Sequence, residues 1–154
     1  IVEIIDAYRT RWRGAVDVHG ETLLLPGARA LLRRLREAGL AVGVVTAKRH
    51  AEADHLLVAM GIRDLVDVLV GTDEVPHGKP APDSALLALR QLGVPAEGTW
   101  YVGDALSDVA MALAAGMRPL GVTTGACSAE QLLDAGAELV VSATDDLAAV
   151  LLAP

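Results

Sequence analysis

The chain has 154 residues, of which 53% are hydrophobic and 21% charged, and its formal net charge is −7. This length suits one domain with a sizeable core, and the hydrophobic content excludes a disordered chain. The acidic balance argues against nucleic acid or an anionic membrane as the main partner, because both attract clustered lysine and arginine side chains.

The first part of the chain predicts two helices. Residues 1–15 carry apolar side chains at helical spacing, with arginines on the opposite face. No capping residue precedes this helix, so it begins as though it belonged to something longer. A second helix is expected over 28–38, with Pro26 at its start and Gly39 as its C-terminal cap.

Strands and helices alternate through the rest of the chain. A continuous apolar run over 40–45 predicts a strand that is buried on both faces. Further strands are expected at 66–70, 99–102, 119–122 and 139–141. Further helices are expected at 50–60, 83–92, 106–115, 129–134 and 147–152. This alternation predicts an α/β fold, a Rossmann-like three-layer arrangement of a parallel sheet with helices on both faces.

Two carboxylates follow the strand expected at 99–102. Asp104 leaves this strand first, and Asp108 lies one helical turn beyond it. The carboxyl ends of strands are where open α/β sheets place their chemistry, and Mg²⁺ prefers one or two carboxylates with water and phosphate oxygens. Gly103 leaves room for a ligand to approach the backbone. The alternative is that Asp104 is a helix cap and Asp108 a solvated helix residue.

Two further polar groups are expected at the same edge of the sheet. Thr46 directly follows an apolar strand, and its hydroxyl and the backbone N–H of Ala47 can hold a phosphate oxygen. Lys79 lies between a glycine and a proline in a rigid loop, where it can serve as counter-charge to the aspartates and as phosphate ligand. The alternatives are an ordinary helix cap at Thr46 and a solvated lysine at position 79.

Several site types are excluded or not favoured. The single cysteine, Cys127, excludes an internal disulfide framework and a cysteine-based zinc cluster. The four histidines share no metal-ligand spacing. No apolar run reaches membrane-spanning length, and the first residues lack the pattern of a signal peptide. We therefore expect a cytoplasmic protein without a membrane or nucleic-acid partner.

These motifs resemble those of the haloacid dehalogenase-like hydrolases, most closely the phosphoglycolate phosphatases and related pyrophosphatases. The resemblance covers nearly the whole chain and rests on three stretches in this order: Val44 to Lys48, Gly78 to Asp83 and Tyr101 to Asp108. It implies a Mg²⁺-dependent hydrolase whose partner is a small phosphorylated metabolite. In the full-length enzyme the reaction would pass through an aspartyl-phosphate.

The resemblance also implies a role for each candidate residue. Thr46, with Ala47, would bind the phosphoryl group, and Lys79 would neutralise charge between the nucleophile and the phosphate. Asp104 would ligate Mg²⁺. Asp108 would bind the metal through water or hold Lys79.

The family's aspartate nucleophile, in an Asp-x-Asp-Gly-type turn after the first strand, is missing from this sequence. The nearest match begins at Asp17, but His19 stands in place of the second acid, so a degenerate nucleophile turn is the weaker alternative. The resemblance implies that residues 1–20 are the remnant of a helical cap and its return linker. Residues 21–154 would then be a core without its first strand, which belongs between the strands that lead to Thr46 and Asp104.

We therefore expect a fragment of a phosphatase that turns over little substrate by itself. An alternative is a non-catalytic module that binds phosphate or Mg²⁺ and acts through a partner. A receiver or dinucleotide-binding domain is not favoured, because the chain has neither an acidic pair after its first strand nor a Gly-x-Gly-x-x-Gly motif.

Overall fold

The structure is a computed structural model that describes residues 12–125 and 127–153. Residues 12–19 are helical and continue into the short helix η1 (Gly20–Leu23). The elements that follow are α2 (Ala28–Glu37), β1 (Gly43–Val45), α3 (His50–Ala59), η2 (Arg63–Leu65), β2 (Val68–Val70), η3 (Thr72–Glu74), α4 (Asp83–Leu92), β3 (Trp100–Gly103), α5 (Leu106–Ala114), β4 (Arg118–Val122), α6 (Ala129–Asp134), β5 (Leu139–Val141) and α7 (Thr144–Leu151). In these described stretches no helix is both long and apolar enough to cross a membrane.

The predicted α/β fold is confirmed. Two helices and a strand, α4, α6 and β5, have the bounds that the sequence predicts. The short helices η2 and η3 were not predicted. Of the helix predicted over residues 1–15, the first eleven residues lie outside the described part of the chain.

The strands form two separate parallel sheets. One contains β1 and β2, and the other contains β3, β4 and β5 in that order. Each pair of neighbouring strands is parallel, so the carboxyl ends of the strands in each sheet lie on one edge. Within the described residues, β1 and β3 each have a hydrogen-bonded strand neighbour on one side alone.

The prediction that the strand over 40–45 is buried on both faces is wrong. The strand expected over 40–45 begins at Gly43, which is exposed, and Leu40 before it is 43% exposed. On β3 the side chain of Val102 is 38% exposed. Both strands are sheet edges, so the side that carries no neighbouring strand leaves their apolar side chains partly uncovered.

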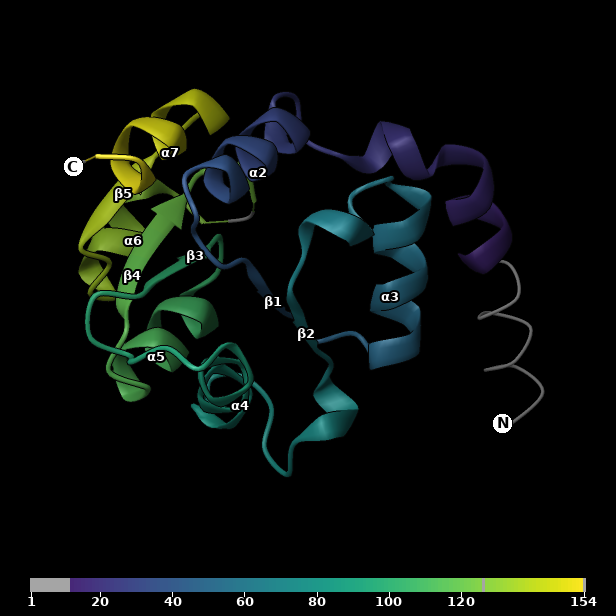
Figure 1. Ribbon diagram of the computed structural model, residues 1–154. Coiled ribbons are helices and arrows are strands. Elements are labelled where there is room, and N and C mark those ends of the chain that lie inside the picture. The colour runs from purple at the N-terminus through teal and green to yellow at the C-terminus, as the bar shows by residue number, and fades with distance from the viewer. Residues whose placement is uncertain (1–11, 126, 154) are drawn as a thin grey trace.

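Helices hold the two sheets together from both faces. On one face α2 packs against α7, and Ala148 of α7 joins a core cluster with Leu31 of α2 and Leu69 of β2. The opposite face carries α4 and α5, as Figure 1 shows. There, Met111 packs with side chains from both sheets, Val45 and Tyr101. The two sheets therefore share their helical layers, although no strand in the described part of the chain joins them.

The helix over residues 12–19 packs against α3. A Cβ at Gly20 would lie 2.6 Å from the Ala59 side chain, so only a glycine allows this approach. Asp17 Oδ1 lies 2.9 Å from His55 Nε2 on α3. Asp17 thus belongs to a helix and does not follow a strand, so the alternative that made it a nucleophile turn is not supported.

We predict that Met111→Ala destabilises the fold by about 2–5 kcal/mol, because it opens a cavity in the cluster shared by both sheets. Leu113→Ala is the matched control on the same helix, since Leu113 is 48% exposed. Its expected cost is below about 1 kcal/mol. Urea unfolding followed by circular dichroism measures both, and equal losses of stability would contradict the assignment of Met111 to the core.

Candidate active site

The Lys79 ammonium lies between the two sheets and contacts both. Its Nζ donates to Asp108 Oδ1 at 2.7 Å, to the Tyr101 hydroxyl at 2.8 Å and to the Val45 carbonyl oxygen at 3.2 Å. The Lys79 side chain is 17% exposed and that of Asp108 8%. The alternative of a solvated loop lysine is therefore wrong.

The first turn of α5 fixes Asp108. Its Oδ2 accepts the backbone N–H of Ala105 at 3.2 Å, while Oδ1 accepts Lys79. A Cβ at Gly103 would lie 2.7 Å from Asp108 Cγ, so Gly103 makes room for this carboxylate, and the approach of a ligand to its backbone stays a prediction. Asp108 is buried and is not a solvated helix residue. Its contacts are those of a residue that holds Lys79, and its part in metal binding stays a prediction.

Tyr101 is a member of the site that the sequence analysis missed. Its hydroxyl accepts from Lys79 and donates to Asp108 Oδ1 at 3.4 Å. Burial, and then the negative charge of Asp108, raises the pKa of Tyr101 above its ordinary value. The hydroxyl therefore keeps its proton. The sequence does contain a signal for Tyr101: it is a tyrosine in an apolar strand that leads to Asp104. A buried tyrosine hydroxyl needs a hydrogen-bond partner, so a polar contact near that strand could have been predicted.

Asp104 leaves the end of β3 and is exposed. It is not the helix cap, since the N-cap of α5 is Ala105. Its side chain lies against Gly125, where a Cβ would approach Asp104 Cγ to 2.5 Å. In the part of the chain that the structure describes, no group of three or more His, Cys, Asp or Glu residues could cage a metal. One exposed carboxylate suits Mg²⁺, which keeps several waters and binds through one or two carboxylates.

Thr46 stands directly after β1, at the end of the strand whose carbonyl Lys79 contacts. The Thr46 hydroxyl accepts the backbone N–H of Lys48 at 3.1 Å. It is not the helix cap, because the N-cap of α3 is Arg49. Ala47, the second predicted phosphate contact, is exposed. The Thr46 hydroxyl thus bonds to the backbone of the turn that follows β1. Its role in binding phosphate stays a prediction.

An acidic pair after β2 anchors the segment that follows Thr46. Asp73 Oδ1 accepts the backbone N–H of His50 at 2.7 Å, and Glu74 Oε2 accepts that of Gly71 at 2.6 Å. Glu74 Oε2 also lies 2.7 Å from His50 Nδ1. The bond from the His50 amide, with a smaller contribution from Arg49, lowers the pKa of Asp73. The sequence analysis missed this pair, because the shared partner His50 becomes a neighbour only through the pairing of β1 with β2.

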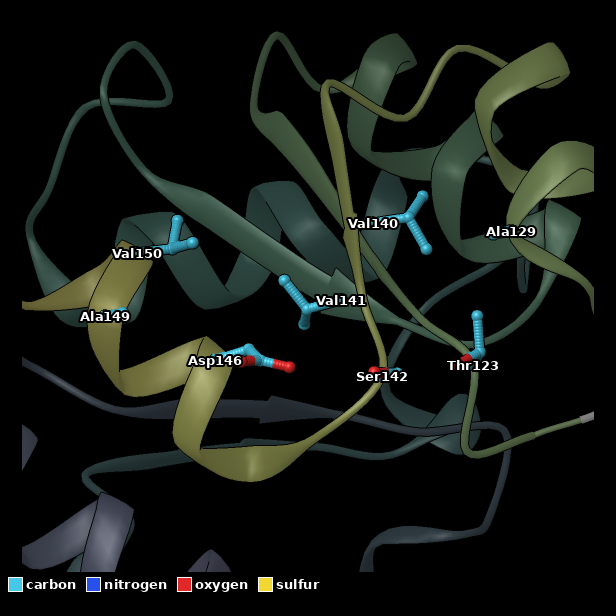
Figure 2. Close-up of a pocket in the computed structure, with 8 residues that line it drawn as sticks. All are labelled: Thr123, Ala129, Val140, Val141, Ser142, Asp146, Ala149 and Val150. Atoms are coloured by element: carbon cyan, nitrogen blue, oxygen red, sulfur yellow. The ribbon is translucent and has the colours of Figure 1, made fainter.

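A separate pocket of about 510 Å³ lies at the carboxyl ends of β4 and β5 (Figure 2). Its polar groups are two hydroxyls and one carboxylate, from Thr123, Ser142 and Asp146. Its other lining residues are Ala129, Val140, Val141, Ala149 and Val150. The residues that line it include no cation, so this pocket lacks the positive charge that a phosphoryl group requires.

Comparison with known proteins agrees with this arrangement. The family model of haloacid dehalogenase-like hydrolases matches residues 2–116. "Probable phosphatase IndB" of Dickeya dadantii is 36% identical over 141 residues, which are 92% of this chain and 61% of that protein. The phosphoglycolate phosphatase of Pseudomonas putida is 34% identical over 135 residues, 88% of this chain and 48% of that protein. The chain thus spans between about half and three fifths of the length of these relatives.

A solved structure from the same family also resembles this chain. A HAD family hydrolase from Deinococcus radiodurans, crystallised with bound phosphate and sodium, superposes with a TM-score of 0.77 and 28% identity. The match covers 82% of this chain and 58% of that protein.

We predict that Lys79 and Asp108 are strongly coupled in stability. Lys79→Met leaves the buried Asp108 carboxylate without its cation, which costs on the order of 3–5 kcal/mol. Lys79→Met combined with Asp108→Asn removes both charges, so the double variant is expected to lose less than the sum of the two single variants, by about 1–3 kcal/mol. Urea unfolding of the four proteins measures this coupling, and strictly additive losses would contradict it. Arg33→Met on the exposed face of α2 is the control for loss of a cation.

Proposed function

Because the chain belongs to the haloacid dehalogenase-like hydrolases, we propose that it carries the phosphoryl- and metal-binding side of a Mg²⁺-dependent phosphatase. The substrate class is a small phosphorylated metabolite, as the names of the relatives suggest. The observation that carries this proposal is the Lys79 ammonium, which is held by the Val45 carbonyl at the end of β1, the Tyr101 hydroxyl of β3 and the Asp108 carboxylate. A fixed cation at the carboxyl edge of a parallel sheet is suited to a phosphoryl group.

Three groups of this chain bind the phosphoryl oxygens in the proposed site. Lys79 supplies the positive charge, and Thr46 and the backbone N–H of Ala47 supply uncharged hydrogen bonds at the end of β1. These donors stabilise the charge that spreads over the phosphoryl oxygens as the ester bond breaks. The phosphate bound to the related hydrolase from Deinococcus radiodurans supports an anion site in this family.

In the proposed site Asp104 would hold Mg²⁺, and Asp108 would orient Lys79 or bind the metal through water. The donor set fits, because Asp104 is an exposed carboxylate and Gly125 leaves the space that its side chain occupies. When bound, Mg²⁺ neutralises the developing phosphoryl charge and draws substrate oxygens to it. The metal, like a cytoplasmic location, stays a prediction of the sequence.

The nucleophile of this reaction lies outside the 154 residues. A strand that leads to a carboxylate is proposed to fill the space between β1 and β3, pairing with both of their open edges. The carboxylate attacks phosphorus, the bond to the leaving alcohol breaks, and water then releases inorganic phosphate. The chain is therefore proposed to be a fragment of a longer protein, of which residues 1–20 end a helical cap.

A second candidate function is a non-catalytic module that binds phosphate or Mg²⁺ and acts through a partner. It is favoured by one observation: Lys79, Tyr101 and Asp108 are joined by hydrogen bonds within the described residues alone. Titration of the chain with Mg²⁺ and orthophosphate, compared with a turnover assay, separates binding from catalysis.

We predict that the 154-residue chain hydrolyses p-nitrophenyl phosphate at a negligible rate. The protein extended by the segment that its gene encodes upstream of Ile1 is expected to hydrolyse it in a Mg²⁺-dependent way, with loss of activity in EDTA. Lys79→Met in the extended protein lowers kcat on the order of a hundredfold or more, because it removes a fixed charge from the transition state. Arg33→Met is the matched control. Rapid, EDTA-sensitive turnover by the short chain would contradict the external nucleophile.

We further predict that Gly125→Ala weakens Mg²⁺ binding on the order of tenfold, because the new methyl group takes the space of the Asp104 carboxylate. Gly14→Ala is the matched control, since a Cβ there has no described neighbour within 4 Å. Isothermal titration with Mg²⁺ measures both affinities, and an unchanged affinity in Gly125→Ala would remove Asp104 from the metal site.

A further inference from the structure

We propose that Tyr101 is a positioning residue for phosphoryl transfer: with Asp108 it holds two N–H groups of the Lys79 ammonium and leaves the third for the phosphoryl group. This inference rests on the proposed function of Lys79 as a phosphoryl ligand. One of the three Lys79 N–H groups reaches the substrate, and Tyr101 determines which one by holding another.

The Lys79 ammonium uses all of its hydrogen-bond donors. A lysine ammonium has three N–H groups and no acceptor, and here each N–H has a partner within hydrogen-bonding distance. The bonds to Asp108 and Tyr101 are short, at 2.7 and 2.8 Å, and the bond to the Val45 carbonyl is longer, at 3.2 Å. The longer bond is the weakest of the three, so its N–H is released at the lowest cost.

The Lys79 N–H that bonds to the Val45 carbonyl points toward the open edge of β1. Val45 directly precedes Thr46, the proposed phosphate contact. Val42 and Thr46 direct their backbone groups to the neighbouring strand β2, so the alternating backbone of β1 directs the Val45 carbonyl to the open side. The Lys79 N–H that this carbonyl accepts therefore lies on the open side of β1, next to Thr46. A phosphoryl oxygen bound there replaces this weakest acceptor of the Lys79 ammonium.

The Tyr101 hydroxyl is an uncharged group that both accepts from Lys79 and donates to Asp108. A neutral hydroxyl fixes the direction of the ammonium without cancelling its charge, whereas a second carboxylate in its place would cancel it. The Tyr101 ring packs in the cluster of Ala85 and Met111, so the hydroxyl is itself held in position.

The test compares the ¹⁵N-labelled 154-residue chain with Tyr101→Phe and Ser84→Ala. In the wild-type chain we expect a resolved ¹H–¹⁵N signal of the Lys79 ammonium, with a nuclear Overhauser contact to the Tyr101 ring protons. Tyr101→Phe keeps the ring and is expected to speed exchange of the ammonium protons on the order of tenfold, because a hydrogen bond to a charged group is lost. Ser84→Ala removes a different buried hydroxyl, which donates to Met111 Sδ at 3.3 Å, and leaves the Lys79 signal unchanged.

The second readout is kinetic. In the N-terminally extended protein, Tyr101→Phe is expected to lower kcat on the order of tenfold and to change KM by less than about twofold, because a misdirected Lys79 loses contacts made in the transition state. A merely structural role for Tyr101 predicts less folded protein with an unchanged kcat per folded molecule.

Several results overturn the proposal. A wild-type chain without the protected Lys79 signal or the Overhauser contact does so, even where Tyr101→Phe fails to fold. A wild-type exchange rate or a wild-type kcat in Tyr101→Phe also does so. The proposed function fails differently: the extended wild-type protein then hydrolyses no phosphomonoester, although its Lys79 and Tyr101 remain in contact.

Discussion

The contact between the Lys79 ammonium and its three acceptors is the polar interaction on which the site depends. Val45 belongs to one sheet, Tyr101 to the other, and Asp108 to the helix after β3. Burial removes water from a charged pair, and this cost is offset only when the remaining donors and acceptors are satisfied. The hydroxyl of Tyr101 and the Ala105 amide meet that condition. The two sheets must therefore be correctly placed before the charge of Lys79 is fixed.

Two glycines leave the space that the Asp104 and Asp108 carboxylates occupy. The carboxylate of Asp108 fills the space beside Gly103, and that of Asp104 fills the space beside Gly125. Neither glycine has a positive φ, so each is required by close approach and not by backbone conformation. The position of Asp104 consequently depends on the loop after β4, which the pairing of β3 with β4 brings beside it.

Local signals explain which elements the sequence predicts well. The helix at Asp83–Leu92 follows a proline and ends at Gly93, and the helix at Ala129–Asp134 begins with Ser128, whose side chain accepts the Gln131 amide. Strand burial was predicted less well, because it depends on neighbours and not on the strand itself. A run of apolar residues forms a fully buried strand only where helices cover both faces of the sheet and strands protect both edges. β1 has one neighbouring strand in the described chain. It therefore begins later than predicted, at Gly43, and its side chains are partly exposed.

The sequence by itself determined the family and the alternation of strands and helices, and it predicted that Thr46, Lys79 and the two aspartates lie near the carboxyl ends of the strands. These features follow from motifs and from the common direction of parallel strands. Only the tertiary structure decided which side chains touch. Lys79 meets partners that are 22 to 34 positions away along the chain, and Tyr101 enters the site through one of these contacts. Spacing along a sequence fixes neighbours within a helix or strand, whereas contacts between elements are set by how their side chains pack.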